Sequence, residues 1–290
     1  MKLPITIYLY WLRLAWFIRK HFGTKTYGLG WSAARVGAAF SFQFNGLPFL
    51  FLPRAARSYC LLPAGIPNEP ETHKFLSRVL ARSGGGVTFI DIGASIGEFA
   101  ITMAHHDRVH RVIAFEPHPA TADALRASAN LCHRANIDVI EKGVGATTGF
   151  ATFNLNDIAP TGAGLRSSDA NKPLAQIPLC TLDETIAVSP CSPLIVLIDI
   201  EGGELDALRG GQNLIARGKP LIIFEYNATT RKFFQISRAQ ELLGDGYTIY
   251  RLRSEDGLLD NDLTSTWNVV ALPHQCSWQH LKQQKELFSE

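Results

Sequence analysis

The segment Asp91-Ile-Gly-Ala-Ser-Ile-Gly-Glu98 has the residue types of a loop that binds a ligand between a strand and a helix. It overlaps the end of an apolar, β-branched run, VTFIDI at 87–92. Gly93 and Gly97 allow a tight turn and a close approach of the backbone to a ligand at a helix N-terminus. Three chemistries compete for such a loop, and each requires different neighbours.

Two of these chemistries fit poorly. A dinucleotide fingerprint would place glycine at positions 93, 95 and 98, but Ser95 and Glu98 stand there, and a carboxylate is unfavourable beside a pyrophosphate. Residues 93–97 also match the G-x-S-x-G nucleophile elbow, with Asp199 and His274 downstream in the order of a hydrolase triad. No His-Gly oxyanion motif precedes the loop. The match is therefore weak, but a serine hydrolase that uses Ser95 is kept as an alternative function.

The third chemistry is the binding of S-adenosylmethionine. Asp91 would orient the methionine end of the cofactor, and Glu116, 23 residues after Gly93 at the end of the next apolar run, would accept hydrogen bonds from ribose hydroxyls. The predicted cofactor-binding residues are Asp91, Gly93, Ala94, Ser95, Gly97, Glu116, Pro117, Gly143, Val144 and Asp199.

Further carboxylates end two later apolar runs. Asp199 and Glu201 stand two residues apart where the run 194–199 finishes, and Glu225 finishes the run 220–226. Converging carboxylates raise one another's pKa, which suits one of them to act as a general base. We predict Asp199 as the first candidate for this base, followed by Glu201 and Glu225. The same groups could hold a divalent cation, so a metal is possible, but none is predicted.

Strand-like and helix-like segments alternate from Gly84 onward. Apolar runs at 87–92, 111–116, 137–142, 194–199 and 220–226 are separated by amphipathic stretches at 97–106, 119–135 and 203–217. This rhythm predicts βαβ units and a parallel sheet covered on both faces.

Two more runs, 247–252 and 267–272, are joined by a loop too short for a crossover helix, so they should be antiparallel. The fold class is therefore α/β, with a doubly wound seven-stranded sheet that has an antiparallel end. The polar segment 156–172 is predicted to be a loop over the acceptor site.

The first 68 residues differ in charge from the rest of the chain. The net charge of the 290 residues is +2, too balanced for a general nucleic-acid binder, yet no acidic residue precedes Glu69. The segment 5–20 reads as an apolar helix interrupted by Arg13. It is shorter than the roughly 20 apolar residues that a membrane span needs. It would either lie on an anionic membrane surface or pack against the protein, and both options stay open.

A β-hairpin is predicted within 39–53, where Phe40, Phe42 and Phe44 alternate with smaller residues and Asn45-Gly46 supplies the turn. It should cover apolar surface on the main domain. We therefore predict an N-terminal extension, 1–83, and a cofactor-binding domain, 84–290.

The chain has five cysteines, an odd number, and no C-x-x-C pair. This usage argues against a disulfide framework or a zinc cluster and for a reducing compartment. We expect a cytoplasmic protein, with a peripheral position on the inner membrane surface as the variant that the 5–20 helix allows. The expected partner is a small-molecule or glycan acceptor, and the oligomeric state is left open.

The ordered set FIDIGASIGEFA, VIAFEPHP, IPLCTLDETI, VLIDIEGGELDALRGG and PLIIFEYN resembles the FkbM family of S-adenosylmethionine-dependent methyltransferases over about residues 87–227. The resemblance implies a class I, Rossmann-like methyltransferase fold and, most often, methylation of a hydroxyl on a sugar or natural product. Family members more often have Asn where this chain has Ser95, and Ala where it has Gly203. A non-catalytic S-adenosylmethionine-binding protein is the other alternative.

Overall fold

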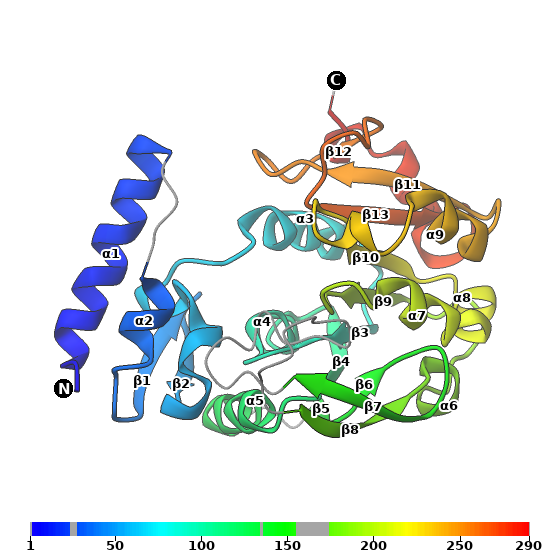
Figure 1. Ribbon diagram of the computed structural model, residues 1–290. Helices are drawn as coiled ribbons and strands as arrows, with labels where there is room; N and C mark the ends of the chain where they lie inside the picture. The colour runs from blue at the N-terminus through cyan, green and yellow to red at the C-terminus, as the bar shows by residue number, and fades with distance from the viewer. Residues whose placement is uncertain (1, 24–27, 134–135, 155–173, 290) are drawn as a thin grey trace.

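An eight-stranded sheet forms the centre of the computed structural model, which describes residues 2–23, 28–133, 136–154 and 174–289 (Figure 1). The predicted loop 156–172 lies outside the described residues. The order across the sheet is β12-β11-β13-β10-β9-β3-β4-β5. In chain order these strands are β3 (Val87–Ile92), β4 (Val109–Phe115), β5 (Ile137–Ile140), β9 (Leu194–Ile198), β10 (Leu221–Glu225), β11 (Tyr247–Leu252), β12 (Leu259–Asp260) and β13 (Asn268–Pro273).

All seven predicted strands belong to this sheet, and β12 adds a two-residue edge. Five neighbouring strands, β5, β4, β3, β9 and β10, are parallel to one another. β13 pairs antiparallel with both β10 and β11. The doubly wound sheet with an antiparallel end is thus confirmed. β9 and β10 are buried along their whole length, which explains why their sequences are continuous apolar runs rather than alternating ones.

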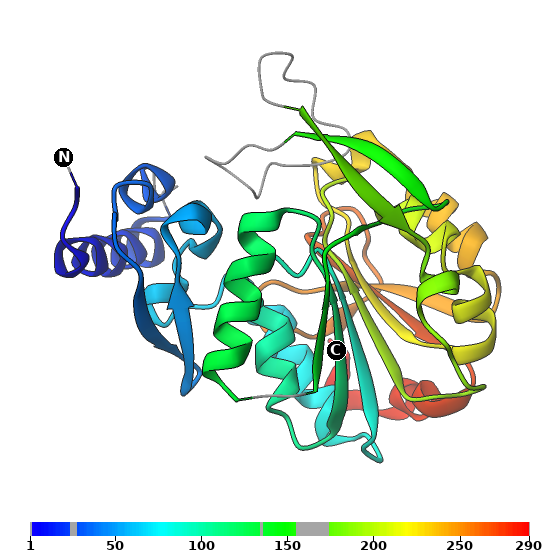
Figure 2. The ribbon, with the colours of Figure 1, turned by 90° about the horizontal axis from the view of Figure 1, so that it is seen from below.

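Helices cover both faces of the sheet, as Figure 2 shows. One apolar core lies between the sheet and α3 (Pro70–Ala81), α4 (Glu98–Ala104) and α5 (Pro119–Leu131). The other lies against α6 (Leu182–Thr185), α7 (Glu204–Arg209), α8 (Gln212–Gly218) and α9 (Ile236–Leu243). The predicted single helix 203–217 is divided into α7 and α8. Between these two helices the backbone at Gly210 lies so close to that of Gly145 that a Cβ on Gly210 would be 2.1 Å from the Gly145 carbonyl oxygen.

A second, three-stranded sheet was not predicted. It consists of β6 (Gly143–Val144), β7 (Gly149–Asn154) and β8 (Leu174–Cys180), in the order β6-β8-β7. Its strands follow β5 and precede β9, so the chain leaves the central sheet here before it returns.

The N-terminal part begins with α1 (Ile5–Phe22) and α2 (Leu29–Ala33), followed by the predicted hairpin, β1 (Phe40–Phe44) and β2 (Leu47–Phe51). Asn45 and Gly46 have positive φ angles of 50° and 76°, as a tight two-residue turn requires. The hairpin packs on α5, where the Ser128 hydroxyl accepts a hydrogen bond from the Leu50 amide at 3.0 Å. Its phenylalanines therefore extend the core of the sheet, as expected of a cover over apolar surface.

Short 3₁₀ segments connect the remaining elements. They are η1 (Pro53–Tyr59), η2 (Leu62–Ala64), η4 (Thr230–Lys232), η5 (Cys276–Gln283) and η6 (Lys285–Leu287). Among the described residues, no helix has both the length and the apolar composition that a membrane span requires.

Cysteine usage argued against a disulfide framework, but one disulfide is present, between Cys191 and Cys276. An odd count excludes complete pairing but not one bond between residues 85 positions apart. The C-terminal segment is held at this place by Trp278, whose indole N–H donates to the Leu194 carbonyl at 2.7 Å. Cys60, Cys132 and Cys180 remain thiols. Cysteine usage therefore no longer supports a reducing compartment.

Candidate active site

The loop between β3 and α4 is held in a left-handed conformation at three positions. The φ angles are 88° at Gly93, 48° at Ser95 and 92° at Gly97. A Cβ on Gly93 would lie 1.9 Å from the carbonyl oxygen of Asp199, so only glycine fits where this loop touches the end of β9. The ends of β3 and β9 are thus in direct backbone contact.

Glu116 joins this loop to the end of β4. Its Oε2 accepts a hydrogen bond from the Ser95 amide at 2.8 Å, and its Oε1 accepts one from the His118 amide at 2.7 Å. Burial raises the pKa of Glu116, while these amide hydrogen bonds oppose the increase. Each carboxylate oxygen can accept a further hydrogen bond. Glu116 therefore shapes the loop and keeps acceptor capacity for a ligand.

Asp91 is the most deeply buried acid of the loop, with 3% of its surface exposed. Its Oδ2 has no hydrogen-bond partner among the described residues. Burial, and then the charge of Asp199, raise the pKa of Asp91 to about 8. A buried acceptor of this kind is costly unless a ligand satisfies it.

Asp199, Glu201 and Glu225 come together, as their positions after β9 and β10 predict. One carboxylate oxygen from each lies within 4.8 Å of the others. The side-chain amide of Asn227 donates through Nδ2 to Glu225 Oε1 at 2.5 Å, whereas Glu225 Oε2 has no partner among the residues described. Burial is the largest cause of the raised pKa of each of these three carboxyls. For Glu201, burial and the charges of Asp199 and Glu204 raise the pKa to about 7. Oxygen ligands at this spacing also suit a hard divalent cation, so that alternative stays open.

A cavity of about 670 Å³ lies above these strand ends, within the usual size range of ligand pockets. Of the predicted site residues, it is lined by Asp91, Gly93, Ala94, Ser95 and Asp199. Gly97, Glu116, Pro117, Glu201 and Glu225 are not part of the lining. Gly143 and Val144 lie in β6, paired with β8, and both are buried.

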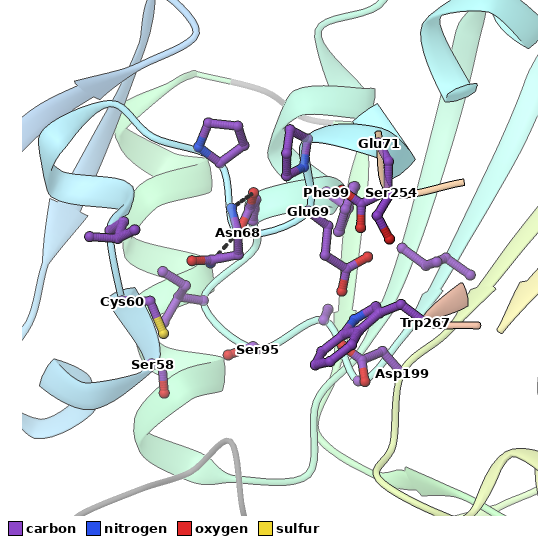
Figure 3. Close-up of a pocket in the computed structure, with 18 of the residues that line it drawn as sticks. Ser58, Cys60, Asn68, Glu69, Glu71, Ser95, Phe99, Asp199, Ser254 and Trp267 are labelled. Carbon is purple, nitrogen blue, oxygen red and sulfur yellow. Dashed lines mark hydrogen bonds between the residues drawn. The ribbon is translucent and has the colours of Figure 1, made fainter. Parts of the chain in front are cut away.

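Much of the lining comes from the N-terminal part, which sequence reasoning did not assign to the site. Figure 3 shows Glu69, Trp267 and Asp199 close together at one side of the cavity. Glu69 Oε2 accepts hydrogen bonds from Thr72 Oγ1 at 2.9 Å and Asn268 Nδ2 at 2.6 Å. Burial and the nearby charge of Asp199 raise the pKa of Glu69.

Glu98 also faces this cavity, where Asn68 and His73 hold it. The Asn68 amide N–H and side chain donate to its two oxygens at 3.0 and 2.6 Å, and His73 Nε2 lies 3.0 Å from Oε1. The segment 67–71 thus fastens the N-terminal part to the β3–α4 loop. The only sequence signal was that Glu69 is the first acidic residue of the chain, between Pro67 and Pro70.

The triad of the hydrolase alternative is not assembled. β13 runs antiparallel to β10, with Asn268 opposite Glu225, so His274 follows β13 at the opposite edge of the sheet from Ser95. There His274 Nε2 lies 2.9 Å from Thr248 Oγ1. Ser95 therefore has no histidine base from this strand, and the elbow match is a coincidence of sequence.

A comparison with models of protein families identifies the family of the chain. The profile of the family described as "Methyltransferase FkbM domain" matches residues 91–254, more than half of the chain. A curated hexuronic acid methyltransferase, AglP from Haloferax volcanii, is 29% identical over 125 residues, or 43% of this chain and 50% of the relative. "Methyltransferase 1" of Beauveria bassiana is 24% identical over 141 residues, or 42% of this chain and 57% of the relative. The chain thus spans about half the length of these relatives.

Among solved structures, the methyltransferase FkbM of Methylobacillus flagellatus is 20% identical. The alignment covers 63% of this chain and 42% of that one, with a TM-score of 0.43.

Proposed function

Because the chain belongs to the FkbM family of methyltransferases, we propose that it transfers a methyl group from S-adenosylmethionine to a hydroxyl of a sugar or glycan. The strand order β5-β4-β3-β9-β10-β13-β11 is that of the class I methyltransferase fold implied by the family. The observation that carries the proposal is the meeting of the glycine loop, Asp91 and Asp199 at the floor of one cavity.

The residues around the cavity floor fit this cofactor. Gly93 lets the loop lie directly against the end of β9, which brings Asp91 close to Asp199. Asp91 Oδ2, which has no partner among the described residues, is suited to accept from the amino group of the methionine moiety. Glu116 has acceptor capacity left for ribose hydroxyls. When bound, the cofactor supplies an electrophilic methyl group on a positively charged sulfonium. The acidic floor of Asp91, Glu98 and Asp199 complements that charge.

Asp199 is the proposed general base. A hydroxyl oxygen that takes up a methyl group must lose its proton, and a carboxylate at the cavity floor can accept it. The raised pKa of Asp199, about 6, makes it a stronger base than an ordinary aspartate while it remains ionised at neutral pH. Glu201 and Glu225 lie behind Asp199 and are the second and third candidates.

The aromatic and basic side chains of the cavity lining suit a saccharide acceptor. Trp16 and Trp267 line the cavity and offer aromatic surface against which a sugar ring can pack. Arg19 and Lys20, from the last turns of α1, add positive charge near the same opening. These cations favour an acceptor with an anionic group, such as a sugar acid. The printed name of one relative, a hexuronic acid methyltransferase, supports the same class.

The test is calorimetric titration with S-adenosylhomocysteine, followed by an assay of methyl transfer to sugar acids and neutral glycans. The variant Asp91→Ala/Glu116→Ala should lose at least about 100-fold in affinity, since two charged hydrogen-bonding groups are removed. The surface variant Asp123→Ala/Glu141→Ala, which affects only the exposed ion pairs of Arg126, is the control. Folded wild-type protein that binds no S-adenosylhomocysteine would refute the proposal, and binding without methyl transfer would favour the non-catalytic alternative.

A further inference from the structure

The three sides of helix α1 have different surroundings. One side is buried against the hairpin and its neighbours through Tyr8, Leu12 and Ala15. A second side, near the C-terminal end of the helix, contributes Trp16, Arg19 and Lys20 to the cavity. The third side faces away from the protein, since α1 lies at the outer edge of the molecule in both ribbon views (Figures 1 and 2).

The outward side carries large apolar residues at helical spacing. Their exposed fractions are 55% for Ile7, 70% for Tyr10, 51% for Leu14 and 52% for Phe17. Spacings of three, four and three residues place them on one face of the helix. We call these four residues the outer stripe. A row of four large apolar side chains is more than the scattered exposure usual on a monomer surface.

Positive charge borders the outer stripe. Arg13 follows Tyr10 by three positions, Lys20 follows Phe17 by three, and both are exposed. No acidic residue precedes Glu69, and this part of the chain carries eight lysines and arginines. An apolar face flanked by cations is the pattern of a helix that lies in the headgroup layer of an anionic membrane.

We propose that α1 docks the protein on an anionic lipid surface, lying parallel to it with the outer stripe inserted among the headgroups. Charge decides between this occupant and a second copy of the chain. Two copies that met through this face would bring Arg13 and Lys20 of one against those of the other, whereas anionic headgroups neutralise them. The helix need not span the bilayer, in agreement with its length and composition.

The position of the cavity follows from this orientation. Because α1 lines the cavity with Trp16, Arg19 and Lys20 while the outer stripe faces the lipid, the part of the cavity that α1 lines lies one helix diameter, about 10 Å, from the headgroups. The docking itself does not depend on the proposed function, since none of the stripe residues lines the cavity.

The test is co-sedimentation of the full chain with vesicles of phosphatidylcholine, alone or with 30–40% phosphatidylglycerol (roughly the anionic fraction used to mimic a charged leaflet). We expect binding to the anionic vesicles at low salt, and weaker binding as salt screens the cations. Tyr10→Ser/Phe17→Ser should lower the partition coefficient at least about tenfold, and Arg13→Gln about fivefold. The matched control is Leu131→Ser/Phe150→Ser, which removes exposed apolar residues elsewhere.

Circular dichroism and thermal unfolding verify that each variant is folded, independently of cofactor binding. Failure of the wild type to sediment with anionic vesicles would overturn the proposal, as would equal losses in the stripe and control variants. A wild-type dimer that Tyr10→Ser/Phe17→Ser converts to a monomer, without vesicle binding by either, would assign the outer stripe to a second copy instead.

Discussion

Replacing Asp199 with asparagine should stabilise the protein in the absence of ligand and at the same time remove its activity. Burial, and then the charge of Glu98, raise the pKa of Asp199 from 3.8 to about 6. Such a shift corresponds to about 3 kcal/mol of folding free energy for a fully desolvated group. Asp199 borders the cavity, and its charge is screened there, so we expect on the order of 1 kcal/mol.

The direction of the pH dependence follows from the raised pKa. Below pH 3.8 the carboxyl is protonated in the folded and unfolded chains alike, and it costs nothing. As the pH rises toward about 6, the unfolded chain loses this proton first, so the folded state loses stability, and the loss is complete above that value. Asparagine carries no charge and avoids this loss. No side-chain hydrogen bond of Asp199 within the described part of the chain is given up.

The assay pairs thermal unfolding with steady-state kinetics. At pH 8 the variant should melt about 2 °C higher than the wild type, with a smaller difference at pH 5. Its kcat should fall about 10²–10⁴-fold, the usual contribution of a general base, while affinity for S-adenosylhomocysteine stays within a few-fold. Asp138→Asn, on an exposed strand position paired with Arg111, should change neither. Full kcat in Asp199→Asn would exclude Asp199 as the base, and a lower melting temperature at pH 8 would refute the electrostatic reasoning.

Two further predictions concern the floor of the cavity. Gly93→Ala should cost at least about 3 kcal/mol of stability and abolish cofactor binding, because the residue has φ 88° and its Cβ would lie 1.9 Å from the Asp199 carbonyl oxygen. Gly46→Ala, with φ 76° but open space around it, should cost only about 1 kcal/mol, and equal losses in the two variants would mean that the contact with the Asp199 carbonyl does not restrict position 93. The affinity for S-adenosylmethionine relative to S-adenosylhomocysteine should rise between pH 6 and 9, because ionisation of Asp91, whose pKa is about 8, favours the ligand with the extra positive charge. Asp91→Asn should reduce that rise in isothermal titrations, and a ratio independent of pH in the wild type would refute it.

The central sheet was predictable because the sequence signal of a buried strand lies within a few consecutive residues. A strand buried on both faces needs an uninterrupted apolar run, and LIVLI of β9 is buried at all five positions. The small sheet β6-β8-β7 gives no such signal. β6 is two residues long, and β8 pairs with segments that precede it by up to 36 positions, as in the pairing of Gly143 with Leu179. Pairing of that kind is set by tertiary structure rather than by composition.

Only the part of the site that lies at the strand ends was predictable from such signals. The convergence of Asp91, Asp199 and Glu225 at one edge was predictable because the carboxyl ends of parallel strands meet there, a rule that requires only the strand positions. Glu69, Trp16 and Arg19 reach the cavity because the hairpin packs on α5 and carries the N-terminal part across the strand ends. That packing joins residues about 80 positions apart, such as Leu50 and Ser128, and no local pattern predicts it. The disulfide between Cys191 and Cys276 escaped prediction for the same reason.

The hydrogen bonds at the strand ends separate the acids into two groups. Glu116 and Glu204 each accept two backbone amides, and Glu225 accepts the Asn227 side chain, so these carboxylates stabilise the loops on which they stand. Asp91 Oδ2 has no donor among the described residues, as is also true of Glu204 Oε2 and Glu225 Oε2, but of these three residues Asp91 is the one that lines the cavity. A buried carboxylate oxygen without a donor is costly unless a ligand satisfies it. Asp91 Oδ2 is therefore the buried oxygen that a ligand in the cavity can satisfy, and a positively charged ligand suits it best.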